Sequence, residues 1–267
     1  MFVLNHKVAV VTGAGSGLGK AISLAFIKAG ASVGIADINE NTLKNTEGEM
    51  RKINEKILSI KTDVSNESQV KNFINKTVEK FGKLDIIVNN AAVAIGGYPI
   101  TEMSNDDWQK LIGINLSSVF YGCKHAIPHL KKNKGGSIIN IASAQAHTPL
   151  PGWAAYAGAK GAIISMTKQI ASEFGPFNIR SNSISPGTIA TEMVNQVVAE
   201  DGTGTLLEDF ILMHPLGRIG KPEEIGATAV FLASDGGAFV NGADFRVDGA
   251  LTITPRTRPG AGSHSKK

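Results

Sequence analysis

Short apolar runs alternate with amphipathic segments along most of the chain. Runs rich in β-branched residues predict strands at residues 7–12, 32–37, 57–62, 84–89, 137–142, 179–184 and 243–247. Apolar residues recur at helical spacing between them, which predicts helices at 21–29, 40–54, 67–80, 108–130, 154–174 and 223–233. Residues 190–215 have the least regular pattern, and we expect them to form a mobile lobe over a binding site.

Strands that are apolar throughout and alternate with helices are typical of a parallel sheet with helices on both faces. Right-handed crossovers then give an α/β, Rossmann-like, doubly wound sheet, in which ligands bind beyond the carboxyl ends of the strands. The sequence contains neither an internal repeat nor a linker. We therefore expect a single domain over residues 1–254, with its substrate lobe at about 190–215.

Charge is unevenly distributed along the chain. The formal net charge of +4 equals the charge of Arg256, Arg258, Lys266 and Lys267, so the rest of the chain is neutral. We expect residues 255–267 to form a basic, flexible tail, and we expect the neutral body to bind no nucleic acid.

Cysteine usage and hydropathy indicate the compartment. The single cysteine, Cys123, excludes an intrachain disulfide, and its apolar helical surroundings predict a packed thiol in a reducing compartment. Residues 1–7 lack the apolar core of a signal peptide, and the longest uncharged run, 135–159, is interrupted by Gly, Pro and Ser. These features predict a cytoplasmic protein without a membrane span.

A glycine-rich turn, T-G-A-G-S-G-L-G at residues 12–19, connects the first strand to the first helix. Glycines at such a turn let the backbone approach a pyrophosphate, and the helix N-terminus offers free N–H groups. The spacing is T-G-x-x-x-G-x-G rather than G-x-G-x-x-G, because Leu18 stands where the third glycine would fall. A purely structural turn is the alternative, but the position between strand and helix favours a dinucleotide site.

Asp37 ends the second strand, about 20 residues after the glycines, where a carboxylate can bind the ribose hydroxyls of adenosine. A carboxylate there repels the 2′-phosphate of NADP, and neither Ile38 nor Ser16 supplies a cation. We therefore expect NAD as the cofactor. The alternative is a solvated acid that caps the next turn.

Tyr156 and Lys160 lie four residues apart in the predicted helix 154–174, and so share one face. A free tyrosine has a pKa of about 10, too high for a base near neutral pH. Lowering that pKa by about two to three needs roughly 3–4 kcal/mol, which Lys160 and a positively charged nicotinamide ring can supply at short range. By itself the spacing also fits an ordinary pair on a helix surface.

Over nearly all of residues 5–253 the sequence resembles the short-chain dehydrogenase/reductase family, of the NAD-dependent type. The resemblance rests on motifs in the family's order: residues 12–19, Asp63, Asn89-Asn90-Ala91, Asn115, Ser143, Tyr156 with Lys160, and Pro186-Gly187. Two positions depart from the family's pattern, because Ala92 and Ala250 stand where the family usually has glycine. Neither departure touches the residues expected to carry the chemistry.

The resemblance implies roles for these residues. Tyr156 would exchange the substrate hydroxyl proton, Lys160 would hold the nicotinamide ribose and lower the pKa of Tyr156, and Ser143 would bind the substrate oxygen. Asn115 would lie at a break in its helix and hold a water that links Lys160 to solvent. The expected cofactor residues are Gly13, Ser16, Gly17, Leu18, Gly19, Asp37, Ile38, Asp63, Val64, Asn90, Ala91, Tyr156, Lys160, Pro186, Gly187, Ile189 and Thr191.

Other residues are weaker candidates. We expect Gln145 to line the substrate pocket beside Ser143 and Tyr156, whereas His147 is as well placed to face solvent, and Trp153 and Met193 fit either core or pocket wall. His125 and His129 lack the intervening Glu of a zinc protease, so no metal site is expected. The resemblance also implies a homotetramer or homodimer.

Three functions remain open. The first is an NAD-dependent oxidoreductase that interconverts a secondary alcohol (a sugar, a polyol or a cyclic alcohol) and its ketone. The second is a 3-oxoacyl-type ketone reductase, which would prefer NADPH and carry a basic surface for an acidic carrier. The third is a non-catalytic dinucleotide-binding sensor.

Overall fold

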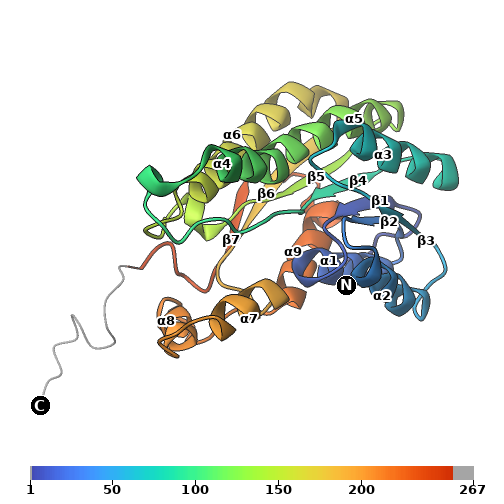
Figure 1. The fold of residues 1–267 in the computed structure, drawn as a ribbon. Coiled ribbons are helices and arrows are strands. Elements are labelled where there is room, and N and C mark those ends of the chain that lie inside the picture. The colour runs from blue at the N-terminus through green and yellow to red at the C-terminus, as the bar shows by residue number, and fades with distance from the viewer. Residues whose placement is uncertain (1, 255–267) are drawn as a thin grey trace, which may run out of the picture.

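Continuous apolar runs form the strands of one parallel sheet. The computed structural model describes residues 2–254. The strands are β1 (Val8–Thr12), β2 (Ser32–Asp37), β3 (Ile57–Lys61), β4 (Ile86–Asn89), β5 (Gly136–Ile141), β6 (Ile179–Pro186) and β7 (Asp244–Val247). Their order is β3-β2-β1-β4-β5-β6-β7, so the direction of winding reverses between β1 and β4 (Figure 1). Ligands of such sheets bind beyond the carboxyl ends of the strands at this reversal.

Helices cover both faces of the sheet (Figure 1). On one face lie α1 (Gly17–Lys28), α2 (Glu40–Arg51) and α9 (Pro222–Ala233). On the other lie α3 (Glu67–Phe81), α4 (Asn105–Ile112), α5 (Ser118–Lys132) and α6 (Ala154–Phe174). The predicted single-domain, doubly wound α/β fold is therefore confirmed.

The core has two main layers, one on each face of the sheet. Successive residues of a strand point to opposite faces, so Ala9 and Val11 pack into the layer beneath α1 and α9, whereas Val10 packs into the layer beneath α3 and α5. All five residues of β1 are buried. This burial on both faces explains why the strands are continuous apolar runs rather than alternating ones.

Three segments differ from their predicted form. The expected helix 108–130 is α4 and α5 joined by a π-helical turn at Gly113–Ser117, which includes Asn115, so this helix does contain the break that the resemblance implied. Strand β6 continues to Pro186, two residues beyond the prediction. The expected lobe contains two short helices, α7 (Glu192–Ala199) and α8 (Leu206–Leu212), which extend away from the sheet beside α9 (Figure 1).

Two further expectations concern the C-terminal tail and membrane-spanning helices. The predicted tail, residues 255–267, lies outside the described residues. Within residues 2–254, every helix is too short or too polar to cross a membrane.

Candidate active site

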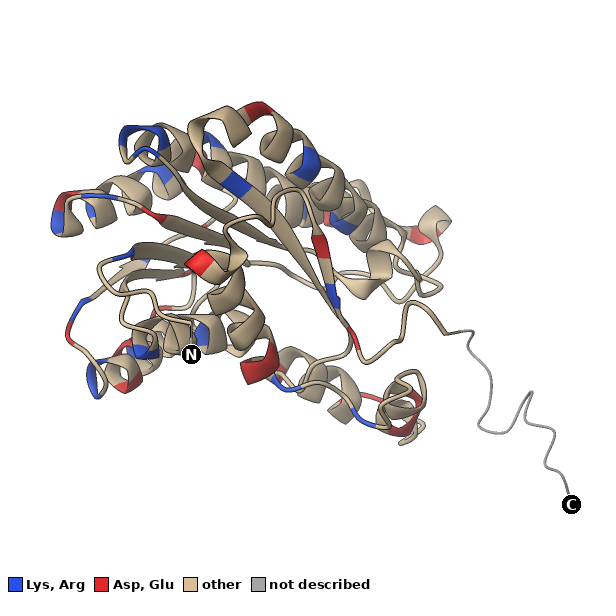
Figure 2. Ribbon diagram, turned by 180° about the vertical axis from the view of Figure 1, so that it is seen from behind, with Lys and Arg blue, Asp and Glu red and all other residues tan. Residues whose placement is uncertain are grey.

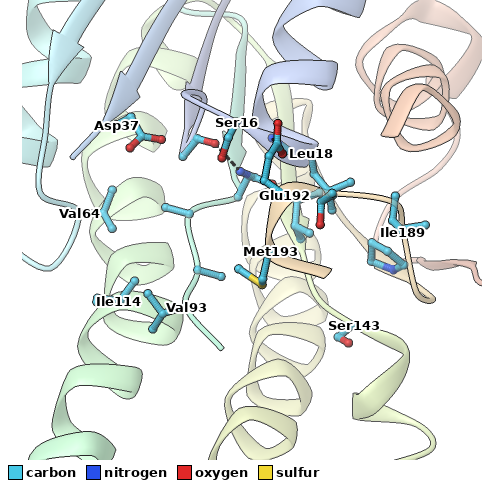
Figure 3. A pocket seen from close by; sticks show the side chains of 18 of the residues that line it. Ser16, Leu18, Asp37, Val64, Val93, Ile114, Ser143, Ile189, Glu192 and Met193 are labelled. Carbon is cyan, nitrogen blue, oxygen red and sulfur yellow. Dashed lines mark hydrogen bonds between the residues drawn. The ribbon is translucent and has the colours of Figure 1, made fainter. Parts of the chain in front are cut away.

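A cavity of about 370 Å³ lies at the carboxyl ends of the strands (Figure 3). Every residue expected to bind the cofactor lines it except Gly19. Figure 3 shows Asp37 and Val64 toward one end of this cavity and Ser143 toward the other. One continuous cavity therefore runs from Asp37, where the adenosine of a dinucleotide is expected, to the catalytic residues. An extended ligand could occupy its whole length.

The glycine turn brings the backbone of three segments into close contact. Gly13 has φ +64°, and a Cβ there would lie 2.8 Å from the Cα of Ala91. A Cβ on Gly19 would lie 2.0 Å from the carbonyl oxygen of Gly13. Gly19 therefore packs behind the turn and does not line the cavity, and its role as a cofactor contact stays a prediction.

Asp37 fixes the turn at the adenosine-type end. Its carboxylate accepts hydrogen bonds from the N–H of Gly15 at 2.9 Å and of Asn39 at 2.9 Å. Asp63 lines the same end of the cavity. Among residues 2–254, Lys160 is the only Lys or Arg that lines this cavity, and it lies at the catalytic end. The Asp37 end is therefore acidic, with no cation in its lining.

The end of β4 is bonded to the end of β1. The side-chain amide Nδ2 of Asn90 donates to the carbonyl oxygens of Thr12 and Gly13 at 2.9 and 3.1 Å. The next loop is held by Asn115, whose amide donates to the carbonyl of Val93 and accepts from its N–H, both at 2.9 Å. Asn115 is buried and does not line the cavity, so the structure places it as a support for the Val93 loop.

Ser143, Tyr156 and Lys160 meet where β5 ends and α6 begins. Ser143 is the N-cap of a short 3₁₀ turn, Ala144–Ala146, which fixes its hydroxyl at the strand end. Tyr156, in the first turn of α6, lines the same cavity as Ser143. Lys160 is fully buried and donates from Nζ to the carbonyl oxygen of Ile141 at 2.8 Å. Three of the four residues expected to be catalytic are therefore brought together, and the fourth is the buried Asn115.

Burial dominates the electrostatics of this group. It raises the pKa of Tyr156, while the neighbouring Ser143 hydroxyl lowers that pKa by a smaller amount. Burial lowers the pKa of Lys160 to about 8. The Lys160 ammonium lies 5.6 Å from the centroid of the Tyr156 ring and bonds Ile141 instead of the phenol. The expected lowering of the Tyr156 pKa by Lys160 is thus not seen in the protein alone.

A second cavity, of about 410 Å³, begins at the same catalytic residues. Ser143, Tyr156, Pro186, Gly187, Met193 and Val194 line both cavities. Its remaining walls come from the loop after β5, from α7 and α8, and from Leu251. The catalytic hydroxyls therefore stand between two spaces, one at the ends of the strands and one under the lobe.

The comparisons with known proteins agree with this geometry. A family model described as enoyl-(acyl carrier protein) reductase matches residues 13–252. A protein of Aspergillus oryzae named short chain dehydrogenase/reductase astE is 40% identical over 254 residues, which cover 94% of this chain and 97% of the relative. The chain belongs to the short-chain dehydrogenase/reductase family.

Two further proteins with different named activities are also similar to this chain. The 3beta-hydroxysteroid dehydrogenase 2 of Eggerthella lenta is 38% identical, over 92% of this chain and 95% of the relative. The crystal structure of 3-ketoacyl-(acyl-carrier-protein) reductase from Brucella melitensis complexed with NADH has a TM-score of 0.87 and 31% identity. That match covers 94% of this chain and 100% of the other.

The structure also settles where the weaker candidates lie. Gln145, Trp153 and Met193 line the second cavity. His147 does not line it, and its Nε2 pairs with the Asp244 carboxylate at 2.7 Å. Cys123 is a buried packed thiol, whose pKa burial raises to about 12. Within residues 2–254 no group of three His, Cys, Asp or Glu side chains is arranged to hold a metal.

Sequence reasoning missed two groups of residues in this family member. Leu206, Phe210 and Met213 line the second cavity, but helices as short as α8 give only a weak periodic pattern. Buried His214 accepts from the N–H of Thr188 at Nε2 and therefore donates from Nδ1 to the carbonyl of Phe210. His214 thus connects the lobe to the loop after β6. A contact between residues so far apart in the sequence cannot be predicted from a local sequence pattern.

Proposed function

We propose that this protein is an NAD-dependent dehydrogenase that interconverts a secondary alcohol and its ketone. The observation that carries the proposal is the meeting of Ser143, Tyr156 and Lys160 between two cavities. One cavity has the lining of a dinucleotide site, and the other is open to a substrate. A dinucleotide-binding sensor would have no need of a phenol and a serine hydroxyl that line both cavities.

The residues of the first cavity fit a nicotinamide dinucleotide. Gly13 and Gly17 line this cavity with bare backbone, which lets a phosphate group lie close to the turn. The glycine turn leads into the N-terminus of α1, which favours an anion there. Asp37 would hold the adenosine ribose and Lys160 the nicotinamide ribose. The bound cofactor would supply the hydride acceptor for alcohol oxidation.

The chain's own residues would handle the proton. Tyr156 would take the proton of the alcohol hydroxyl through its phenol oxygen, and Ser143 would orient the substrate oxygen by a hydrogen bond. Because burial raises the pKa of Tyr156, phenolate forms only when further positive charge is close to it. Oxidation should therefore accelerate as the pH rises, since more of the phenol is then ionised. In the reverse direction Tyr156 would return the proton.

The acidic lining around Asp37 supports NAD over NADP. A 2′-phosphate would lie beside the carboxylates of Asp37 and Asp63, with no Lys or Arg of the described chain in the cavity lining at that end. NAD⁺ and NADP⁺ are to be compared by the initial rate of reduced cofactor formation with a panel of secondary alcohols. We expect kcat/KM to favour NAD⁺ at least about tenfold. Asp37→Ala should narrow that ratio, and a wild-type preference for NADP⁺ would overturn the assignment.

A 3-oxoacyl reductase is the second candidate, because the Brucella melitensis protein bears that name. Such an enzyme would dock an acidic carrier protein beside the substrate cavity. The lobe at 190–215 contains no Lys or Arg, and its acids are Glu192, Glu200, Asp201, Glu208 and Asp209. Figure 2 shows red segments on the lobe, with blue segments on the chain beside it. Like charges across such an interface oppose docking.

Assays with thioester substrates separate these candidates. Turnover of a 3-oxoacyl thioester with NADPH that exceeds every alcohol and simple ketone would favour the reductase. Reduction of an enoyl thioester, the reaction named in the description of the family model, is tested in the same assay. We expect neither thioester to be a better substrate than a simple ketone with NADH.

A further inference from the structure

The second cavity has a mainly apolar wall, and its polar side chains are those of Ser143, Gln145, Thr148, Trp153, Tyr156 and Thr188. Its volume of about 410 Å³ lies in the usual range for a drug-sized ligand. Most of the wall comes from the loop after β5, the two helices of the lobe and the segment after β7. Their contributions include Leu150, Trp153, Val197, Leu206, Phe210 and Leu251. No Asp, Glu, Lys or Arg of the described chain lines this cavity.

Such a wall discriminates by desolvation. A polyol or sugar entering it would leave most of its hydroxyls without partners, which is unfavourable because each had been hydrated. A charged substrate would be disfavoured more strongly, since no opposite charge lines the cavity in residues 2–254. An apolar body instead gains affinity in proportion to the surface it removes from water.

One polar atom in this cavity is exceptional. The side-chain oxygen Oε1 of Gln145 is buried and has no hydrogen-bond partner within the described structure. The backbone of Gln145 is held beside the catalytic serine, because its N–H donates to the hydroxyl of Ser143 at 3.1 Å. Buried polar atoms are normally paired. Because Gln145 lines the cavity, a rotation of its side chain would bring this unpaired oxygen to a hydrogen-bond donor of a bound ligand.

We propose that the substrate is an uncharged, mostly apolar fused-ring alcohol or its ketone, with a second hydrogen-bonding group that meets Gln145. The proposal rests on the dehydrogenase function proposed above. It narrows the sugar, polyol or cyclic alcohol expected from the sequence to the cyclic and apolar end. The reacting carbinol lies at Ser143 and Tyr156, and the rings lie under the lobe.

The first test varies the size of the substrate. Wild-type kcat/KM with NAD⁺ is measured for sorbitol, cyclohexanol, decahydro-2-naphthol and a four-ring hydroxysteroid. Each added methylene that is buried should raise kcat/KM about fourfold, so the two-ring alcohol should exceed cyclohexanol on the order of a hundredfold. Sorbitol should be the poorest substrate. If sorbitol or cyclohexanol is the best substrate of the series, the proposed class is wrong although the dehydrogenase assignment stands.

The second test addresses the wall and Gln145 by matched variants. Phe210→Asp places a charge in the cavity and should lower kcat/KM for decahydro-2-naphthol at least about tenfold. Leu207→Asp on the same helix is the control, because Leu207 is 41% exposed and does not line the cavity. Wild type should prefer decahydronaphthalene-2,6-diol to the mono-alcohol about tenfold, and Gln145→Leu should abolish this preference. Equal effects of the two Asp variants, or an unchanged preference for the diol, would contradict the proposal.

A binding measurement separates the proposal from the dehydrogenase assignment. Trp153 lines the cavity, whereas the other tryptophan, Trp108, does not. In a Trp108→Phe background, a fused-ring ketone should change the Trp153 fluorescence saturably, and sorbitol should not. Saturable binding without turnover of any alcohol or ketone would support the cavity's ligand class and refute the dehydrogenase assignment. Turnover of small polar alcohols without binding of the ring ketone would do the reverse.

Discussion

The two ends of the active site are built in different ways. At the cofactor end, the functional groups stand on the ends of fully buried strands such as β1, and the turns are bonded to one another through Asn90 and Asp37. At the substrate end, α7 and α8 have no fully buried residue. We infer from this difference that the sheet holds the proposed cofactor site rigidly. The part that selects a substrate is weakly supported, and so easily varied.

A few contacts join these regions. His214 bonds the loop after β6, and Ile189 pairs with Gly220 in a short parallel bridge, so both ends of the lobe are anchored. Glu192, at the start of α7, accepts a hydrogen bond from the N–H of Gly17 at 2.9 Å. This bond crosses the first cavity, and Figure 3 shows Glu192 near Ser16 and Leu18 of the glycine turn.

The largest expected effect contrasts one glycine from each region. Gly19→Ala would place a Cβ 2.0 Å from the carbonyl oxygen of Gly13, whereas a Cβ at Gly202 in the lobe meets nothing within 4 Å. We expect Gly19→Ala to lower the free energy of unfolding by at least about 3 kcal/mol, although alanine favours a helix, and Gly202→Ala to change it by less than about 0.5 kcal/mol. Urea denaturation measures both. Equal losses would mean that the two regions are packed alike.

A second contrast concerns charge. Lys160 is buried and its pKa is lowered to about 8 from 10.5, so folding makes its protonated form less favourable by about 3 kcal/mol. Below pH 8 the folded protein carries this penalty, and it fades as the pH rises toward 10.5, because the folded state then binds fewer protons than the unfolded state. Lys160→Met should therefore stabilise the protein by about 2 kcal/mol at pH 7.5, after loss of the bond to Ile141, and by less at pH 10.

The control for this contrast is Lys168→Met, at an exposed position of the same helix. It should change the free energy of unfolding by less than about 0.5 kcal/mol at either pH. Urea denaturation at the two pH values measures both variants. A destabilised Lys160→Met protein at pH 7.5 would show that the bond to Ile141 outweighs the penalty of burial.

The smallest effect tests the contact between the regions. Glu192 occupies an amide of the glycine turn that the proposed pyrophosphate would use, and its charge repels that group. Glu192→Ala should therefore tighten NADH binding about three- to tenfold, measured by calorimetry, whereas Glu200→Ala at the other end of α7 should leave it unchanged. Weaker binding in Glu192→Ala would indicate that this carboxylate chiefly closes the lobe over the cofactor.

The difference between the sheet and the lobe also explains which parts of the site could be predicted from the sequence. Strand ends could be located from apolar runs, and a parallel sheet brings those ends together, so the glycine turn and Asp37 could be placed at one edge. Asn90, Ser143 and Tyr156 could be added to that site only through the family resemblance. The packing role of Gly19 could not be foreseen, because a glycine beside a ligand and one beside another backbone look alike in sequence. The contact of Glu192 with Gly17 joins residues 175 positions apart, and no local pattern encodes it.

The directions of the pKa changes at Tyr156 and Lys160 could not be predicted from the sequence either. The pairing of Tyr156 with Lys160 on one helix face was foreseeable from their spacing. Whether Lys160 bonds the phenol or a strand carbonyl depends on the end of β5, which approaches the helix only in the folded chain. The depth of burial, which sets the direction of both pKa changes, is likewise a property of the fold.

The most direct test of the account is the turnover of Tyr156→Phe, which removes one hydroxyl from the point where the two cavities meet. We expect kcat for oxidation of decahydro-2-naphthol with NAD⁺ to fall about a thousandfold, because the group that accepts the alcohol proton is gone. The dissociation constant of NADH should stay within about twofold of wild type, which shows that the cofactor end is intact. Turnover within a few-fold of the wild-type rate would contradict the account.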